Sequence, residues 1–451
     1  MIFIMRKFIL MMTAILAMSS AVMAEDHVMA ATKSQQKADE QPATLSLNLS
    51  EAQTYAVRQN RSLKNASLAV QEAYAARWQT IAAMLPQVDG SIGKTVMYDE
   101  DFKEKTINLT GVPMSMSPWA YGITTSIGLN GQAVVGALLN NVAIDMKKIA
   151  LEQSESQLRG SVMSSYVSVL ALQSISALLD SSLMNIQSLE AITQNAVAAG
   201  AAEQTSADQI RVRVNTLKNS INAQKRNIEL ATNSLKVLMN VPVETELVLT
   251  EKLEDVLSPD RVVSLLSENF AIENNLNYQL LQKQVELAKK NVHLAGWAYG
   301  PTVSLAYQYS YRDYGKEEGF SMMNSPHTVA FTLSMPLWSS GKRAAGVVEK
   351  KIALEEAKNN LSETTDNLAI QYHQLCFNLT NAYETYLNEK ENIEVSQRVF
   401  ASATNKYRYG ASSNMELTNA SNDLINAQSS YVQSILSLVN AQVELEKFLN
   451  N

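Results

Sequence analysis

The fold is decided by residues 301–354, which read PTVSLAYQYSYRDYGKEEGFSMMNSPHTVAFTLSMPLWSSGKRAAGVVEKKIAL. From Thr302 to Tyr311 polar and apolar residues alternate, a period-two pattern that is typical of a strand with one apolar face. A second alternating run, residues 328–335, follows a polar segment that contains glycine, so the two runs predict a long β-hairpin. Beyond Pro336 and Gly341 the apolar spacing becomes helical. We therefore expect a β-hairpin that leads into a very long helix.

Composition favours long helices over a set of ordinary globular domains. The 451-residue chain contains 16 glycines and 9 prolines, and 18% of its residues are charged. Prolines are absent from residues 119–241 and 337–451, so each stretch can continue as helix. Ala, Ser, Asn, Gln and Leu fill these stretches, which favours helices that pack on two sides.

The N-terminus has the features of an export signal. Two basic residues precede an apolar run that ends in small residues, so we predict a signal peptide over residues 1–24, with cleavage after Ala24. The single cysteine, Cys376, lies far downstream, and the mature protein is therefore expected to carry no N-terminal lipid. Residues 25–44 predict a disordered leader. Loss of the two basic residues with the signal changes the formal net charge from −7 to −9, which argues against nucleic acid as a partner.

The chain contains an internal duplication. The hexapeptide KKIALE occurs at residues 147–152 and again at residues 350–355, and in both halves the predicted order is helix, hairpin, long helix, turn and second long helix. We predict a first repeat over residues 45–240, a linking region over 241–275 and a second repeat over 276–451. The expected hairpins lie at about 88–130 and 302–336, and the expected long helices at about 132–198, 205–240, 341–408 and 414–449.

The sequence also predicts where the first helix begins and breaks and where the strands of the first hairpin lie. The helix that starts near Leu47 is expected to use Ser50 as its cap and to break near Asn60. The strands of the first hairpin are expected at 88–98 and 121–130, joined by an acidic loop that contains proline.

The second long helix of each half carries a heptad seam. In the first half the seam consists of Ile210, Val214, Leu217, Ile221, Gln224, Ile228, Ala231, Leu235 and Leu238. In the second half it consists of Ala420, Leu424, Ala427, Tyr431, Ser434, Leu438, Ala441, Leu445 and Phe448, with a neighbouring seam through Leu417, Ile425, Val432, Ile435 and Val439. Two seams indicate two neighbours, so the helices are expected to form a curved wall.

The predicted strands are long enough to cross a membrane. No uninterrupted apolar run of about twenty residues follows the signal, so we expect no spanning helix. Strands of about ten alternating residues can cross a bilayer when tilted. Four strands cannot close a barrel, since the smallest membrane barrels have about eight. A dimer would give a barrel filled by side chains, whereas a trimer would give twelve strands and a lumen.

The chain resembles the TolC family of outer-membrane efflux proteins over about residues 45–450. The resemblance rests on the duplication and on the motifs Leu85-Pro86-Gln87, Met335-Pro336-Leu337-Trp338-Ser339-Ser340-Gly341 and Tyr407-Arg408-Tyr409-Gly410. It implies a mainly α fold with a membrane β-barrel portion, in which a trimeric 12-stranded β-barrel continues as a long α-helical barrel in the periplasm. It also implies an outer-membrane channel for efflux or type I secretion that works with a periplasmic adaptor and an inner-membrane pump, and needs no cofactor.

The resemblance further implies where the channel closes. Family members narrow the periplasmic tip near the turn between the last two long helices, with a ring of acidic residues. On that pattern the tip residues are Tyr407, Gly410, Glu416, Asn419 and Asp208. Asn419 replaces one family carboxylate, and Ser412 stands where the best-known member has a basic residue, which weakens the case for a salt bridge in the lock.

The junction between barrel and tunnel is expected at Pro86, Pro301, Pro336 and Gly341. Pro336 has Ala133 as its mate in the first repeat, so the junctions after the two hairpins are expected to differ in shape.

Two roles remain open for Glu416. Residues 413–416, Ser-Asn-Met-Glu, fit a capping box, in which serine and glutamate satisfy backbone N–H groups at a helix start, and Thr205 to Asp208 fit the same pattern. Three symmetry-related copies of Glu416 would instead form a carboxylate ring that favours cations in a narrow mouth.

Other chemistry is weakly supported. His373 and Cys376 lie one helical turn apart, which is better explained by helix packing than by a metal site. The tyrosines of 307–314 are better explained as an aromatic girdle at a membrane interface than as a ligand platform. No nucleophile–base pair or phosphate loop is recognisable, so we do not expect an enzyme. The competing hypothesis is a periplasmic coiled-coil adaptor or structural protein without its own pore.

Overall fold

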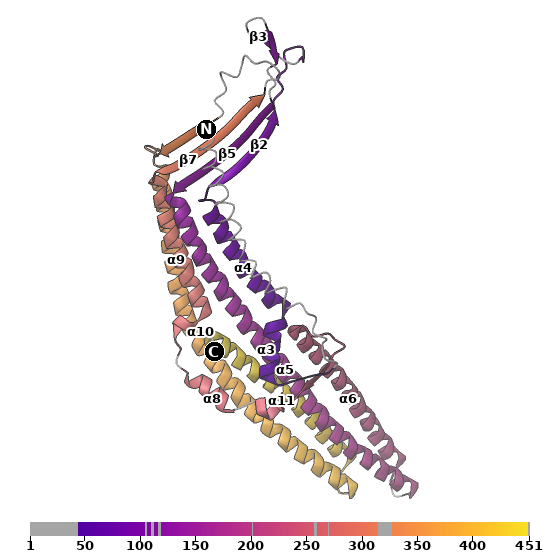
Figure 1. Cartoon of the computed structure of the whole chain (residues 1–451). Coiled ribbons are helices and arrows are strands. Elements are labelled where there is room, and N and C mark those ends of the chain that lie inside the picture. The colour runs from indigo at the N-terminus through magenta and orange to yellow at the C-terminus, as the bar shows by residue number, and fades with distance from the viewer. Residues whose placement is uncertain are drawn as a thin grey trace.

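The structure, a computed structural model, describes residues 44–103, 106–109, 112–115, 119–200, 202–256, 259–268, 270–313 and 327–449. The predicted signal peptide lies outside these residues, as does the predicted leader except for Thr44. The molecule is long, with a sheet at one end and a bundle of helices that extends away from it (Figure 1). The prediction of a mainly α fold with a β portion is confirmed.

The sheet at the end of the molecule has four strands in the order β2-β5-β7-β8. They are β2 (Gln87–Lys94), β5 (Trp119–Asn130), β7 (Thr302–Asp313) and β8 (His327–Ser334). Every neighbouring pair is antiparallel, with Ile123 opposite Tyr309 and Leu305 opposite Phe331. The strands of the two halves thus lie in one sheet, joined by the pair β5–β7.

Two helical hairpins form most of the remaining molecule. The first joins α5 (Gly131–Ala198) to α6 (Gln204–Met239), and the second joins α10 (Lys342–Arg408) to α11 (Asn414–Leu449). With 68 residues, α5 is about 100 Å long at 1.5 Å per residue. The seam residues Ile210, Val214, Leu217 and Ile221 of α6 are buried, and so are Leu424, Leu438 and Leu445 of α11. The predicted seams therefore face the interior of the bundle.

Shorter helices lead into the sheet. In the first half these are α3 (Leu49–Gln59) and α4 (Arg61–Ala82), and in the second half α9 (Leu276–Gly296) and the 3-10 turn η3 (Trp297–Tyr299). Asn60 ends α3 and caps α4, because its side chain accepts hydrogen bonds from the N–H groups of Ser62 and Leu63. In both halves a shorter helix is thus followed by two strands of the sheet and then by two long helices.

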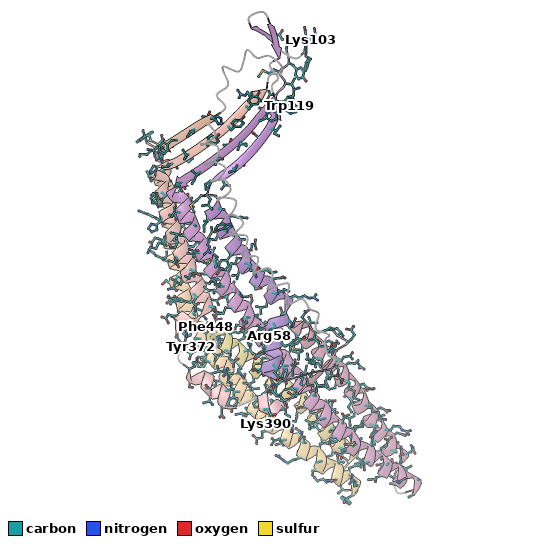
Figure 2. The ribbon with its side chains drawn as sticks, viewed as in Figure 1. Arg58, Lys103, Trp119, Tyr372, Lys390 and Phe448 are labelled. Atoms are coloured by element: carbon teal, nitrogen blue, oxygen red, sulfur yellow. The ribbon has the colours of Figure 1, made fainter. Side chains whose placement is uncertain are left out.

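A small mixed region lies at mid-length of the bundle. Strand β1 (Thr44–Leu47) pairs in parallel with β6 (Glu246–Leu249), followed by α7 (Leu253–Val256), α8 (Pro259–Ser267) and η2 (Ile272–Asn274). The hydroxyl of the buried Tyr166 donates to the carbonyl of Leu47 at 3.2 Å, which ties β1 to α5. Phe270 contacts the rings of Tyr372 and Phe448, which lie close together in Figure 2.

Two predictions about the first repeat are wrong. Asn48, rather than Ser50, caps α3: its side chain accepts from the N–H of Glu51, whose carboxylate accepts in return from the N–H of Asn48. The segment between β2 and β5 is more than a loop, since it contains a second hairpin of β3 (Thr106–Leu109) and β4 (Val112–Ser115). Four-residue strands give too few alternations to be recognised from sequence.

The expectation that no helix could span a membrane is also corrected. Among the described residues, α5 is long and apolar enough to do so by length and composition, and half of its most apolar window is buried inside the molecule. Core helices of soluble bundles meet the same criterion, because Ala, Val and Leu fill both kinds of helix. The criterion therefore does not place α5 in a membrane.

Gly131, the first residue of α5, lies in close contact with Trp297 of η3, near the point where the helices meet the sheet. A Cβ atom at Gly131 would lie 2.1 Å from two ring carbons of Trp297, whereas a Cβ at Gly128 would meet nothing within 4 Å. We expect Gly131→Ala to lower the free energy of unfolding by about 1–3 kcal/mol, the usual cost of overpacking. Gly128→Ala is the matched control and should have no measurable effect. Equal thermal unfolding temperatures for the two variants would contradict this close packing.

Candidate functional site

The four-stranded sheet has one apolar face and one polar face. Residues directly opposite each other in an antiparallel pair share a face, so the register assigns each side chain to a face. One face carries Val88, Ile92, Trp119, Tyr121, Ile123, Ile127, Leu129, Val303, Leu305, Tyr307, Tyr309, Tyr311, Val329, Phe331 and Leu333, together with the polar residues Lys94, Thr125, Asp313 and His327. The other carries Gln87, Asp89, Ser91, Gly122, Thr124, Ser126, Gly128, Thr302, Ser304, Gln308, Ser310, Thr328, Thr332 and Ser334.

The apolar face is open in the single chain. Ile92 is 74% exposed, Val329 is 70% exposed and Phe331 is 69% exposed. Soluble proteins rarely leave an apolar patch of this kind in water, so the face requires a partner or a lipid surface. Helices cover neither face in Figure 1, because the bundle meets the sheet only at its lower edge.

The two edge strands, β2 and β8, have no strand neighbour on their outer sides among the described residues. Strand direction alternates through the order β2-β5-β7-β8, so β2 and β8 run in opposite directions. The β8 edge of one copy can therefore pair antiparallel with the β2 edge of another. Open edges of this kind are closed in barrels, and four strands are too few for one chain to close alone.

Aromatic side chains gather at the end of the sheet that lies farthest from the helices. Trp119 pairs opposite Lys94, whose Nζ lies 5.9 Å from the indole ring, and Figure 2 shows Trp119 at this end. The hydroxyl of Tyr307 lies 2.8 Å from Nδ1 of His327. Tyr309 and Tyr311 share the apolar face, while Tyr314 lies outside the described residues. The described tyrosines that we predict to form an aromatic girdle at a membrane interface therefore share the apolar face.

The two helical hairpins end together at the other end of the molecule (Figure 1). Gly200 follows α5 and Gly410 follows α10, and both have φ of +72°, which side chains other than glycine adopt at a cost. Tyr407 is half-buried against a core of apolar residues that all four long helices share. The sequence-predicted residues Tyr407 and Gly410 thus lie at the turn itself.

Glu416 lies at the start of α11 and makes one half of the predicted capping box. Its N–H donates to Oγ of Ser413 at 3.2 Å, which is the serine half of the capping box. Its carboxylate accepts from the hydroxyl of Ser412 at 2.8 Å and lies 3.8 Å from Nζ of Lys406. Ser412 therefore contacts the carboxylate, and Lys406 supplies a cation nearby.

Asn419 lines the same groove between α10 and α11 as Glu416. Charged side chains of both signs line this groove: Arg398, Lys406, Glu416 and Asp423. Glu416 and Asn419, two of the residues predicted at the second tip, are therefore brought together in this groove.

The first tip differs from the prediction. Glu203, rather than Thr205, occupies the capping position of α6, and no side chain bonds to the backbone there. The hydroxyl of Thr205 donates to the Glu203 carboxylate at 3.1 Å, and Asp208 accepts from the side-chain amide of Gln204 at 3.0 Å. The capping box expected at Thr205 to Asp208 is therefore absent, because the chain enters the helix two residues earlier.

The predicted junction residues all lie where strands meet helices. Pro86 immediately precedes β2, and Pro301 immediately precedes β7. Pro336 and Gly341 lie between β8 and α10, where the carbonyl of Pro336 accepts from Nη1 of Arg343 at 2.7 Å and Gly341 has φ of +83°.

The described residues contain no cluster of three or more side chains able to hold a metal ion. The rings of Tyr372 and His373 are in contact, at 5.6 Å between centroids, and Cys376 is partly buried against the core.

Arg213 is a residue that sequence reasoning missed. Its Nη1 donates to the main-chain carbonyls of Thr418 at 3.2 Å and Leu417 at 3.5 Å, so it joins α6 of the first hairpin to α11 of the second. Desolvation lowers the pKa of its guanidinium. By contrast, Nε of Arg211 lies 3.4 Å from the carboxylate of Glu190 within the first hairpin. A basic residue on a helix carries no sequence signal for a main-chain partner 204 residues away.

Comparisons with known proteins agree with this geometry. Residues 269–451 match the family model described as outer membrane efflux protein. The chain is 23% identical over 295 residues to toxin and drug export protein A of Aggregatibacter actinomycetemcomitans, and the match covers 65% of this chain and 63% of that protein. It is 22% identical over 409 residues to the solvent efflux pump outer membrane protein SrpC of Pseudomonas putida, with 87% of this chain and 83% of that protein covered.

A solved structure of CusC, described in terms of transmembrane channel formation, has the same fold. It superposes with a TM-score of 0.72 at 17% identity, and the match covers 92% of this chain and 94% of that chain.

Proposed function

The chain belongs to the outer membrane efflux protein family, and we propose that three copies of it form a passive conduit across the outer membrane and the periplasm. The observation that carries this proposal is the sheet with one apolar face, one polar face and two open edges. Three copies supply twelve strands, which is enough to enclose a lumen lined by the polar face. The apolar face then contacts lipid.

The helices extend the conduit. A helix about 100 Å long exceeds the roughly 30 Å hydrocarbon core of a membrane several-fold, so the two hairpins project into an aqueous compartment. We propose that this compartment is the periplasm and that the hairpin tips meet a periplasmic adaptor and an inner-membrane pump. The names of the relatives, which refer to efflux pumps and export, support this arrangement. The pump and adaptor would select the cargo.

The conduit is tested by reconstitution. Purified protein added to a planar lipid bilayer should give discrete current steps of uniform size, and the competing hypothesis of a poreless periplasmic coiled-coil protein predicts none. A soluble monomer in cell fractionation, together with a silent bilayer, would overturn the proposed function.

We propose that Glu416 forms part of the channel gate as well as stabilising the start of α11. Three copies of its carboxylate at the narrow tip would attract multivalent cations, which is the basis of selectivity by charged rings. We expect Glu416→Gln to weaken block by a trivalent cation about tenfold in single-channel recordings, because each copy loses one charge while the amide keeps the size of the side chain. Asp423→Gln, which alters another carboxylate of the same groove, is the control. Unchanged block would restrict Glu416 to capping.

A further inference from the structure

The segment of residues 335–341, between β8 and α10, exposes two large apolar side chains. Leu337 is 88% exposed and Trp338 is 86% exposed, which places them among the most exposed apolar residues described. Full exposure of two adjacent large side chains is unfavourable in water. We refer to residues 335–341 as the junction loop.

Contacts from α10 hold the junction loop in one conformation. The guanidinium of Arg343 donates to the Pro336 carbonyl at 2.7 Å and to Oγ of Ser339 at 3.0 Å, and it lies 5.2 Å from the ring of Tyr299. Ser340 has φ of +48°, which costs free energy in a residue other than glycine. A loop that is both held and strained presents Leu337 and Trp338 in a defined direction.

The duplication shows that the junction loop is specific to one place in the chain. In the first repeat β5 continues directly into α5, and Asn130 caps the helix through a 2.7 Å bond from the N–H of Ala133. In the second repeat seven residues separate β8, which ends at Ser334, from α10, which begins at Lys342. Strand β5 is internal to the sheet, whereas β8 is an edge. The additional loop therefore lies where a second copy would meet the chain.

The opposite edge presents a matching surface. Strand β2 follows α4 after the turn at Leu85 and Pro86, so the end of α4 lies at the same rim of the sheet as the junction loop. Two apolar side chains there are also incompletely covered: Trp78 is 43% exposed and Leu85 is 46% exposed. If β8 pairs antiparallel with β2 of the next copy, the loop that follows β8 lies beside the turn that precedes β2.

We propose that a second copy of this chain receives Leu337 and Trp338 at the end of its α4, around Trp78 and Leu85. Through this contact the junction loop joins the helical part of one copy to the helical part of the next copy, at the end of the sheet. This inference rests on the proposed assembly of several copies into one barrel. Lipid at the membrane surface is the other occupant that could cover the two side chains, and the test below separates the two.

Cysteine cross-linking of the full chain tests the contact. In a Cys376→Ser background we combine Trp338→Cys with Leu85→Cys or Trp78→Cys, oxidise membranes and examine the chains on a denaturing, non-reducing gel. Within one chain β2 and β8 are three strand spacings apart, about 14 Å, which is too far for a disulfide. We expect covalent dimers and trimers from at least one double variant and none from the single variants.

A second measurement uses the stability of the assembly. Trp338→Ala should speed dissociation of the oligomer in detergent at least tenfold, whereas Phe102→Ala, which removes another aromatic ring of 85% exposure at the far end of the sheet, should not change it. Oligomers that form without any cross-link and dissociate at the wild-type rate would overturn the junction-loop contact alone and assign the two side chains to lipid. A wild-type protein that forms no oligomer would overturn both this inference and the proposed function.

Discussion

Phe331→Arg is expected to remove the oligomer from the outer membrane. Phe331 lies on the apolar face, opposite Leu305, in the middle of β8. An arginine near the bilayer midplane costs a membrane barrel about 2–4 kcal/mol, and in the proposed assembly three copies carry the change. The amount of heat-modifiable oligomer in the outer-membrane fraction should fall at least tenfold.

The next residue along the strand is the matched control for this experiment. Thr332 lies opposite Ser304 on the polar face, which the proposed barrel turns towards its lumen. Thr332→Arg should therefore assemble at the wild-type level and change ion selectivity instead. Equal assembly of Phe331→Arg and Thr332→Arg would contradict the assignment of the two faces.

Arg213→Ala is expected to raise the open fraction of the proposed channel at the tip formed by the helical hairpins. In the proposed conduit, the ring of helical hairpins can widen only if neighbouring hairpins slide or separate. Arg213 joins the two hairpins of one chain through the Thr418 and Leu417 carbonyls. A hydrogen bond from a charged group contributes about 1.5–3 kcal/mol. Since Arg213 is only half-buried, we expect the lower part of that range, which corresponds to about a tenfold rise in the open fraction.

The experiment compares two arginines of the same helix turn. Arg211 forms its ion pair with Glu190 inside the first hairpin, so Arg211→Ala removes the same charge without breaking the link between hairpins. Single-channel recordings should show more open time for Arg213→Ala and the wild-type value for Arg211→Ala. Arg213→Lys, which can reach one carbonyl, should restore part of the closure. If both alanine variants show the same increase in open time, the loss of a positive charge at the tip explains the effect, and the hydrogen bonds of Arg213 between the hairpins do not.

The parts of the fold that depend on local sequence pattern could be predicted from the sequence. The alternation from Thr302 to Tyr311 indicated β7 and its apolar face, and the absence of proline indicated helices as long as α5 and α10. The predicted break near Asn60 is confirmed, and the side chain of Asn60 caps α4 through its own sequence neighbours. These signals require no knowledge of distant contacts.

Several features that sequence reasoning missed depend on distant contacts or on short segments. The parallel pair of β1 and β6 joins residues about 200 positions apart, and a four-residue strand such as Thr44–Leu47 has little pattern of its own. The Gly131–Trp297 contact and the hydrogen bonds of Arg213 were missed for the same reason, because the partners lie far apart in the sequence. At the first tip, the expected capping box failed because Ser, Thr, Asp and Glu are common near helix starts whether or not they cap.

The central claim is that three copies of this chain close one barrel through their β2 and β8 edges. The most direct test is to count the chains in the complex extracted from the outer membrane, by native mass spectrometry in a mild detergent. We expect a mass of three chains, with no monomer until the detergent is made denaturing. A complex of two chains, whose eight strands would leave no lumen, or a monomer would contradict the account.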